Sequence, residues 1–262
     1  MRIAVCIKQV PDTEARLRVG KDGRWLDEAD LPYVINESDE YALEEAIRIA
    51  EATSGEVVVI SLGPDRVRES LRKALALGAA RAVLLKDEAF LGGDAVATGR
   101  ALAAAIRQED VALVLTGSQS DDLGWGSTAS IVAAELNWPH AWLVMGVTVE
   151  QGSVRLVREM ESGKNEIFRT PLPAVIEVQA GINHPRYASL KGIMAAKKKE
   201  IAERTPADLG LDPSSLGLAG SRVEILSVAA PEAGQGAVMI GGDMVSAAKE
   251  LVGRLQREAR VL

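Results

Sequence analysis

Apolar and polar residues alternate along the first half of the chain in blocks of two kinds. Short β-branched runs that carry almost no polar residues indicate strands buried on both faces of a parallel sheet. These runs are residues 2–10, 56–63, 82–85 and 111–119. Longer blocks with apolar residues three and four apart indicate amphipathic helices. These blocks are residues 36–52, 65–78 and 94–107. Strands that alternate with helices predict a doubly wound, mainly parallel α/β sheet.

Local signals predict where some of these elements begin and end. Asn36 and Ser38 are N-cap candidates for the first helix, because their side chains can accept from free backbone N–H groups. Gly78 is expected to end the second helix in a left-handed conformation. Asp22-Gly23 predicts a small hairpin beside the sheet, since glycine accepts the positive φ of tight turns.

After residue 139 the pattern changes to alternation at period two. Residues 142–150, 153–160 and 165–170 predict an antiparallel meander, and 173–179 predict a return to a buried strand. From residue 205 the chain is rich in Pro and Gly and ends in an amphipathic helix at about 245–258. We therefore expect a nucleotide-binding α/β domain over residues 1–204. Residues 205–262 are expected to form a C-terminal arm that packs on this domain or on a partner subunit.

Composition narrows the class of protein. The 262 residues, 47% of them hydrophobic, suffice for a core, and the formal charge of −7 with 3% aromatic residues argues against a nucleic-acid surface. One cysteine and two histidines cannot form a disulfide framework or a Cys/His metal cluster, so no metal site is expected. The first strand is too short for a signal peptide, and no apolar run is long enough to cross a membrane. A cytoplasmic protein without membrane insertion is expected.

The candidate ligand site lies where the predicted parallel strands end, because ligands of open α/β sheets bind outside the carboxyl ends of the strands. The most informative segment runs from Gly117 to Thr128, where Gly124 and Gly126 precede a helix that starts at Ser127 and Thr128. Free N–H groups and the helix dipole favour an anion such as phosphate there. The segment matches neither the P-loop nor the dinucleotide fingerprint. A glycine-rich turn with a Ser/Thr cap and no ligand fits it equally well.

Catalytic side chains are poorly represented. His140 and His184 each lie beside a proline and are interpreted as surface turn residues, and Cys6 is interpreted as a core thiol. The pair Asp121-Asp122 could bind a metal or a ribose, although a solvated loop is the simpler interpretation. The residues themselves offer no redox chemistry, so electron handling would require a bound cofactor.

Residues 183–201, "NHPRYASLKGIMAAKKKEI", form a basic segment in an acidic protein. One interpretation is a turn followed by a short helix with solvated lysines at its C-terminal end. The other is a docking surface, since Leu190, Ile193 and Met194 lie at helical spacings with Lys191 and residues 197–199 around them. An apolar anchor inside a polar rim is typical of transient interfaces.

This segment closely resembles the signature region of electron transfer flavoprotein β subunits, in which an Asn-x-Pro-Arg-Tyr corner precedes a leucine-bearing recognition loop and a lysine cluster. Five further segments are similar to that family and occur in family order. They are "VCIKQVPD" (5–12), "NESDEYALEEAIRIAE" (36–51), "SLGPDRVRESLRKALALGA" (61–79), "LTGSQSDDLGWGSTASIVAAELNWP" (115–139) and "LVREMESGKNEIFRTPLPAVIEV" (156–178). The resemblance covers most of residues 1–205 and weakens in the tail.

The resemblance implies a Rossmann-like fold of the adenine nucleotide alpha hydrolase-like type. It also implies an electron carrier without catalytic residues of its own, paired with an electron transfer flavoprotein α subunit that holds most of the FAD. It implies electron transfer from acyl-CoA or related dehydrogenases, as in fatty acid oxidation, to a quinone oxidoreductase, and an AMP in the β subunit. The implied nucleotide contacts are Cys6, Asn36, Asp39, Leu62, Gly117, Gln119, Asp122, Gly126, Ser127 and Thr128. The implied docking residues are Arg186, Tyr187, Leu190, Ile193, Met194, Lys197, Lys198 and Lys199, with Leu190 as the inserted anchor.

One departure concerns the ligand. Many family members have an Asn-Gln-Thr or Ala-Gln helix start where this chain has Gly126, Ser127 and Thr128. AMP remains the expected ligand, with an empty site or a second FAD, as in electron-bifurcating relatives, as alternatives. Two other classes also stay open: a stand-alone adenine-nucleotide sensor of the universal-stress type, and a nucleotide-dependent hydrolase or ligase that uses Asp121-Asp122.

Overall fold

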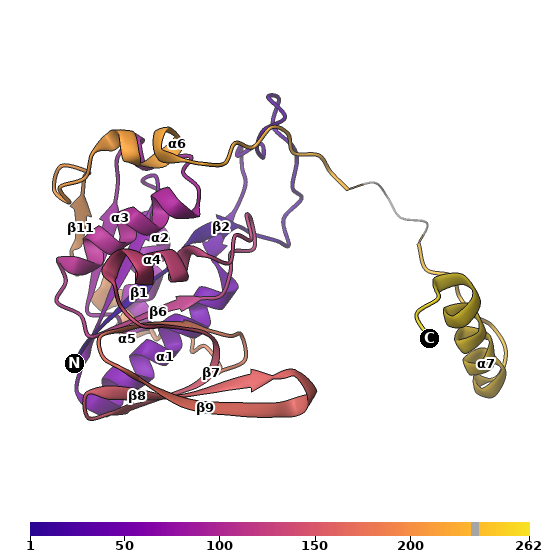
Figure 1. The fold of residues 1–262 in the computed structure, drawn as a ribbon. Helices are drawn as coiled ribbons and strands as arrows, with labels where there is room; N and C mark the ends of the chain where they lie inside the picture. The colour runs from indigo at the N-terminus through magenta and orange to yellow at the C-terminus, as the bar shows by residue number, and fades with distance from the viewer. Residues whose placement is uncertain (232–235) are drawn as a thin grey trace.

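The structure is a computed structural model that describes residues 1–231 and 236–262. Its centre is a nine-stranded sheet in the order β11-β5-β4-β1-β6-β10-β7-β8-β9 (Figure 1). Every neighbouring pair from β11 to β7 is parallel, and β8 and β9 complete the sheet as an antiparallel extension. The strands are β1 (Arg2–Cys6), β4 (Glu56–Leu62), β5 (Arg81–Leu85), β6 (Leu113–Gly117), β7 (His140–Glu150), β8 (Ser153–Met160), β9 (Lys164–Pro171), β10 (Ala174–Val178) and β11 (Ile201–Arg204). The predicted fold class is confirmed.

Helices cover both faces of this sheet and form two separate cores. The main helices are α1 (Glu37–Thr53), α2 (Val67–Leu77), α3 (Ala95–Arg107), α4 (Thr128–Leu136) and α5 (Leu190–Ala196). Apolar residues of α1 and α2 pack on one face, against side chains such as Val5, Val59 and Leu115. Those of α3 and α4 pack on the other face, against Ala4, Ile60 and Val114. Successive strand residues therefore serve opposite cores, which explains the uninterrupted apolar runs in the sequence.

The chain reverses direction across the sheet at β1. The crossover that contains α1 leads from β1 to β4 on one side, and the crossover that contains α3 leads from β5 back past β1 to β6 on the other side. Helices on opposite faces therefore diverge between β1 and β6. A crevice forms at such a switch point in doubly wound sheets.

Several boundaries differ from the predictions made from sequence. The first apolar run is divided, because β2 (Gln9–Pro11) leaves the large sheet and pairs with β3 (Tyr33–Ile35) in a separate two-stranded sheet. The predicted hairpin is reduced to one bridge between Val19 and Leu26, with Gly23 at a positive φ of 67°. Gly78 does follow α2, but at φ 141° and ψ −4°, outside the left-handed helical region. Strand β11 was not predicted, because its four residues are too short to show a period.

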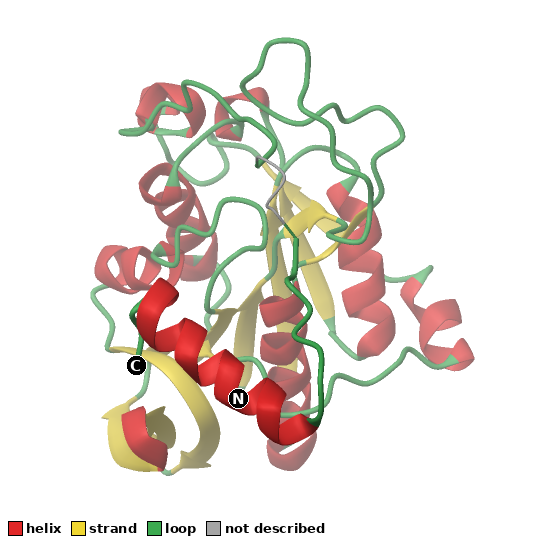
Figure 2. Cartoon of the chain, turned by 90° about the vertical axis from the view of Figure 1, so that its right-hand side faces the viewer, coloured by secondary structure: helices red, strands yellow, loops and turns green. Residues whose placement is uncertain are grey.

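The arm has two parts. Residues after β11 first cross the domain through η3 (Pro213–Ser215) and α6 (Gly217–Gly220), where Leu216 is fully buried. Farther on, α7 (Met244–Arg254) and the π turn η4 (Leu255–Ala259) bury none of their residues. Figure 1 shows α7 projecting beyond the sheet and its helices, and in Figure 2, seen from that side, α7 lies in front of them. Among the described residues, no helix is long and apolar enough to cross a membrane.

Two short helical turns complete the fold, η1 (Glu88–Phe90) before α3 and η2 (Glu161–Gly163) between β8 and β9. The predicted meander is present, since β7, β8 and β9 pair in antiparallel register. Val154 and Leu156 face the core, and Arg158 stacks on the outward-facing ring of Trp142 with its guanidinium carbon 4.8 Å from the ring centre. The alternation at period two thus reflects a sheet with one covered face.

Candidate functional site

A cavity of about 990 Å³ opens at the carboxyl ends of β1, β4 and β6, at the switch point of the sheet. All ten residues predicted to contact a nucleotide line it. They are Cys6, Asn36, Asp39, Leu62, Gly117, Gln119, Asp122, Gly126, Ser127 and Thr128. The volume lies at the upper end of the range usual for small-molecule pockets, roughly 300–1,000 Å³. The structure therefore brings the predicted residues together around one space; their contacts with a nucleotide stay a prediction.

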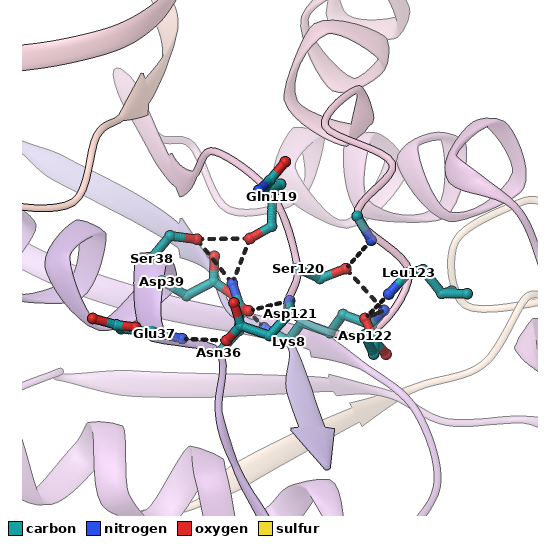
Figure 3. A network of polar contacts seen from close by, with 11 residues as sticks. Lys8, Asn36, Glu37, Ser38, Asp39, Gln119, Ser120, Asp121, Asp122 and Leu123 are labelled. Atoms are coloured by element: carbon teal, nitrogen blue, oxygen red, sulfur yellow. Dashed lines mark hydrogen bonds and ion pairs between the residues drawn. The ribbon is translucent and has the colours of Figure 1, made fainter. Parts of the chain in front are cut away.

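The loop after β6 is held by the start of α1 (Figure 3). Asn36 donates from Nδ2 to the carbonyl of Gln119 at 2.9 Å and accepts at Oδ1 from the N–H of Asp121 at 2.9 Å. The hydroxyl of Ser38 also donates to the Gln119 carbonyl, at 2.8 Å. Asn36 occupies the N-cap position of α1, but its side chain accepts no capping bond from the helix backbone, and its Nδ2 also donates to Ser38 Oγ at 2.9 Å. Its amide instead fixes the path of the loop.

Asp39 holds the other end of the same loop. Its carboxylate accepts from the backbone N–H of Lys8 at 2.8 Å and of Gly117 at 3.0 Å. Burial raises the pKa of Asp39 to about 7. A Cβ at Gly117 would lie 2.3 Å from Ser38 Oγ and 2.5 Å from Asp39 Oδ1, so only glycine allows this close approach. Asp39 and Gly117 therefore join β1, α1 and β6 at the floor of the cavity.

The charge of Asp122 is neutralised within the protein. Lys8 Nζ lies 2.6 Å from Asp122 Oδ1, and Leu123 donates its N–H to the same oxygen at 2.6 Å. Burial alone would raise the pKa of Asp122, but attraction to Lys8 and the hydrogen bonds from Lys8, Ser120 and Leu123 together outweigh it, and the pKa is lowered. Asn36, Asp39 and Asp122 thus engage their polar atoms with the chain, and their observed role is to shape the cavity.

Four helices begin at the cavity, but their N-termini differ in charge. The first turn of α1 carries Glu37, Asp39 and Glu40, α2 carries Glu69, and α3 is capped by Asp94. The first turn of α4 carries no acid, and the side chain of Ser127 at its N-cap position makes no capping bond within the described part of the chain. The first N–H groups of a helix have no partner inside it and carry the positive end of its dipole. An anion is therefore favoured at α4.

The opposite wall of the cavity comes from residues that the sequence did not single out. Asp94 accepts from the N–H groups of Val96 and Ala97 at 2.9 Å and, with its second oxygen, from the N–H of Arg222 at 2.8 Å. This wall consists of residues 90–95, Leu218 and residues 221–225, and Arg24, Trp25, Tyr33 and Arg66 add to it. Gly92-Gly93-Asp94 is a recognisable helix start that could have indicated the first part. The arm carries no local signal, because only tertiary packing brings Arg222 to Asp94.

The cysteine and the two histidines, which were considered as catalytic residues, do not lie in reactive environments. Cys6 is 7% exposed, and burial raises the pKa of its thiol to about 12, so it is a core thiol as predicted. His184 is exposed in a loop, as predicted. The prediction for His140 is wrong: it begins β7, and its buried Nε2 lies 4.0 Å from Glu177 Oε2. Burial lowers the pKa of His140, which places a neutral imidazole beside that carboxyl group.

The predicted docking segment forms a short helix with an exposed apolar surface. Ser189 caps α5 by accepting from the N–H of Gly192 at 3.0 Å. Leu190 is 83% exposed and Met194 is 60% exposed, with Ile193 between them and Tyr187 almost fully exposed just before the helix. Lys197 and Lys198 are exposed at its end. The geometry matches the predicted knob and rim, and its binding role stays a prediction.

Two residues of that set serve as anchors in this structure. Arg186 forms ion pairs with Glu44, at 2.8 Å, and Glu51, at 2.6 Å, both on α1. Lys199 donates to the carbonyl of Ala79 at 2.5 Å, just beyond the C-terminal end of α2. Arg72 of α2 donates in turn to the carbonyls of Ala196 and Lys199. These bonds fix α5 on the domain, so Arg186 and Lys199 position the exposed knob.

Comparisons with known proteins agree with this architecture. Residues 24–209 match the electron transfer flavoprotein domain. The chain is 43% identical to the electron transfer flavoprotein subunit beta of Methylophilus methylotrophus, over 96% of this chain and 97% of that protein. It is 36% identical to the subunit beta of Bradyrhizobium diazoefficiens over the full length of both chains. It is also 37% identical to the caffeyl-CoA reductase-Etf complex subunit CarD of Acetobacterium woodii, over 98% and 99%.

Fold and cavity together define a doubly wound α/β protein with a cleft of ligand size at the switch point of its sheet. Within that class, the chain belongs to the electron transfer flavoprotein β-subunit family, whose members are electron-carrier subunits rather than enzymes. Membership in this family implies an α-subunit partner, and members of the family typically bind AMP or FAD. This family assignment takes the place of the two other classes that the sequence had left open, a stand-alone adenine-nucleotide sensor and a nucleotide-dependent hydrolase or ligase.

Proposed function

We propose that this chain is the β subunit of a heterodimeric electron transfer flavoprotein, and that it holds AMP in the cavity at the carboxyl edge of its sheet. Residues 1–204 form the nucleotide-binding domain and 205–262 the arm. The observation that carries the AMP assignment is that, of the four helix N-termini at the cavity, α4 alone lacks an acidic first turn or cap. The N–H groups of Thr128 and Ala129 would hold the phosphate, which is the established preference of such helix starts.

A single anion position favours a monophosphate over a dinucleotide. The two phosphates of FAD would need a second positive position, and the neighbouring helix start at α3 is already capped by Asp94. Gly124 and Gly126, at φ 61° and 57°, bring the backbone into the left-handed conformation that turns the loop toward α4. AMP would stabilise the domain by linkage, because a ligand that binds only the native state adds to its stability.

FAD, mainly held by the α subunit, would supply the electron chemistry of the complex. The role of this chain is then to bring electron donors and acceptors to that flavin. Leu190 would insert into a pocket on acyl-CoA or related dehydrogenases, as an anchor in a transient interface. Lys191, Lys197 and Lys198, all exposed, would speed encounter by electrostatic steering that weakens with salt. A quinone oxidoreductase would accept the electrons.

The far end of the arm would pack on the α subunit. Met244, Val245, Leu251 and Val252 of α7 are all exposed, at 45% or more. Met244 and Leu251, and likewise Val245 and Val252, lie seven residues or about two turns apart, so the four residues form an apolar stripe along the helix. A stripe of this kind on a helix that contacts no core of its own chain needs a partner surface.

An electron-bifurcating subunit with a second FAD is the alternative. It draws on the 37% identity to a caffeyl-CoA reductase-Etf complex subunit and on the size of the cavity. The partner dehydrogenase would then be a specific one, bound in a stable complex.

The test is the nucleotide content of the complex. The chain is co-expressed with an electron transfer flavoprotein α subunit of the same organism, the complex is purified and denatured, and the released nucleotides are identified by mass spectrometry. One FAD and one AMP per heterodimer is the expected result. Two FAD and no AMP per heterodimer would establish the bifurcating alternative. One FAD and no second nucleotide would contradict the proposal that this chain holds a nucleotide.

A further inference from the structure

The hydroxyl group of Thr116 is buried at the cavity without a partner. Thr116 lies in β6, lines the cavity and is 6% exposed. Its Oγ1 makes no hydrogen bond to any of the described residues. Buried polar groups without a partner are rare in native proteins, because they lose their bonds to water and gain nothing in return. An unpaired hydroxyl that borders a ligand cavity therefore indicates a partner on the ligand.

The direction of the side chain follows from the alternation along β6. Leu113 and Leu115 serve the core under α1 and α2, whereas Val114 serves the core under α3 and α4. Thr116 shares the face of Val114. Helix α4 covers this face of the sheet, and Thr128 and Ala129 at its start line the same cavity as Thr116.

The neighbours of Thr116 on the adjacent strands do not compete for the hydroxyl. In register these neighbours are Cys6 on β1 and Glu177 on β10. Neither forms a hydrogen bond with it, and Ser118 and Gln119 belong to the loop that α1 holds above the strand. The hydroxyl is thus a buried polar group of the cavity lining that has no partner within the described part of the chain.

We infer that Thr116 is a ligand-binding residue whose hydroxyl forms a hydrogen bond with a sugar or phosphate oxygen of the nucleotide. This inference rests on the proposed AMP site and adds a residue that distinguishes a nucleotide from a smaller planar base. Asn36, Asp39 and Asp122 shape the site through bonds within the protein, whereas Thr116 contacts the ligand. The nucleotide-free protein then gains no stability from the Thr116 hydroxyl, because its partner is present only in the complex.

The experiment compares Thr116→Val, which removes the hydroxyl and keeps the shape, with Thr116→Ser, which keeps the hydroxyl. Nucleotide-depleted heterodimers are titrated with AMP and with adenosine by calorimetry, and their melting temperatures are measured without nucleotide. Loss of one hydrogen bond should weaken AMP binding about 5- to 30-fold in Thr116→Val, and Thr116→Ser should stay near wild type. The nucleotide-free Thr116→Val protein should melt at the same or a higher temperature. Loss for AMP alone assigns the bond to the phosphate, and equal loss for adenosine assigns it to the sugar.

Thr170→Val is the matched control, since Thr170 is 8% exposed in β9 and lies outside the cavity lining. It should leave both affinities unchanged. Thr116→Val binding within twofold of wild type would overturn the inference while AMP binding by wild type stands. Equal loss in the Val and Ser variants, with lower melting temperatures, would also overturn it, because the residue would then be structural. If the wild-type complex binds neither AMP nor adenosine, the proposed site itself fails and the inference falls with it.

Discussion

Arg186 and Glu44 form a bidentate ion pair between the loop before α5 and the middle of α1. Arg186 Nε lies 2.8 Å from Glu44 Oε2, and Nη2 lies 3.0 Å from Glu44 Oε1. Glu44 is 6% exposed, and Glu51, about two turns farther along α1, accepts from the other edge of the guanidinium. Two planar groups in this arrangement fix distance and orientation together. This ion pair therefore holds the loop before α5, and with it the exposed Leu190, in a fixed position on α1.

Arg186→Ala should destabilise the protein and misplace the knob. The substitution leaves the buried carboxylate of Glu44 without its partner, at a cost of about 1–3 kcal/mol in the free energy of unfolding. Urea denaturation of the heterodimer measures this loss. Arg186→Lys should restore the charge but only part of the stability, because an ammonium cannot bind both carboxylates in the same plane. An unchanged denaturation midpoint in Arg186→Ala would show that the pair does not hold the loop.

Leu190→Ala should separate docking from folding. Leu190 is 83% exposed, so its truncation should leave the melting temperature, the nucleotide content and the heterodimer unchanged. Loss of a central anchor should lower kcat/KM for reduction by a dehydrogenase at least about tenfold. Ile167→Ala is the control, because Ile167 is a 56% exposed apolar residue on β9, away from α5. Equal rates in wild type and Leu190→Ala would remove α5 from the docking surface.

Gly117→Ala should disturb the cavity itself. The new Cβ would overlap Ser38 Oγ and Asp39 Oδ1, so the contact between α1 and β6 has to open. Overpacking of this kind costs about 1–3 kcal/mol in the free energy of unfolding. The complex should also lose bound nucleotide on gel filtration, measured as nucleotide released per heterodimer. Gly241→Ala provides the comparison, since a Cβ there meets open space, and it should change neither quantity.

The sequence was informative wherever a feature is local. Periodic segments such as residues 36–52 and 94–107 became α1 and α3, and the strand-end rule placed Cys6, Leu62 and Gly117 at one cavity. The roles of individual side chains were less predictable, because they depend on partners distant in the sequence. The family resemblance implied docking roles for Arg186 and Lys199, but α1 and the end of α2 engage them. Arg222 reaches Asp94 only because the arm crosses the domain, and no local pattern encodes that path.

A buried acid on β10 should make stability depend on pH. Glu177 is 6% exposed, pairs in register with Thr116, and has the neutral His140 as a neighbour 4.0 Å away. Burial raises its pKa from 4.5 to about 7, so the folded state binds this proton more tightly than the unfolded state. The free energy of unfolding that Glu177 contributes therefore falls as pH rises from about 4.5 through 7.

Glu177→Gln removes this titration and should become the more stable protein as pH rises. The two proteins should differ little near pH 4.5, and the difference should grow to about 3 kcal/mol, as an upper estimate at 1.36 kcal/mol per pKa unit, near pH 8. Calorimetric melting from pH 4.5 to 8.5 measures it. Burial lowers the pKa of His140, so the contribution of His140 to the free energy of unfolding rises as pH rises through its ordinary pKa of 6.5. Because wild type and Glu177→Gln both contain His140, this contribution cancels in the difference between them. His140→Gln, measured in parallel, confirms that the cancellation holds. A difference in melting temperature that stays constant across this pH range would mean that Glu177 is already ionised in the folded protein at acidic pH, and that the β10 carboxyl group is better solvated than its burial indicates.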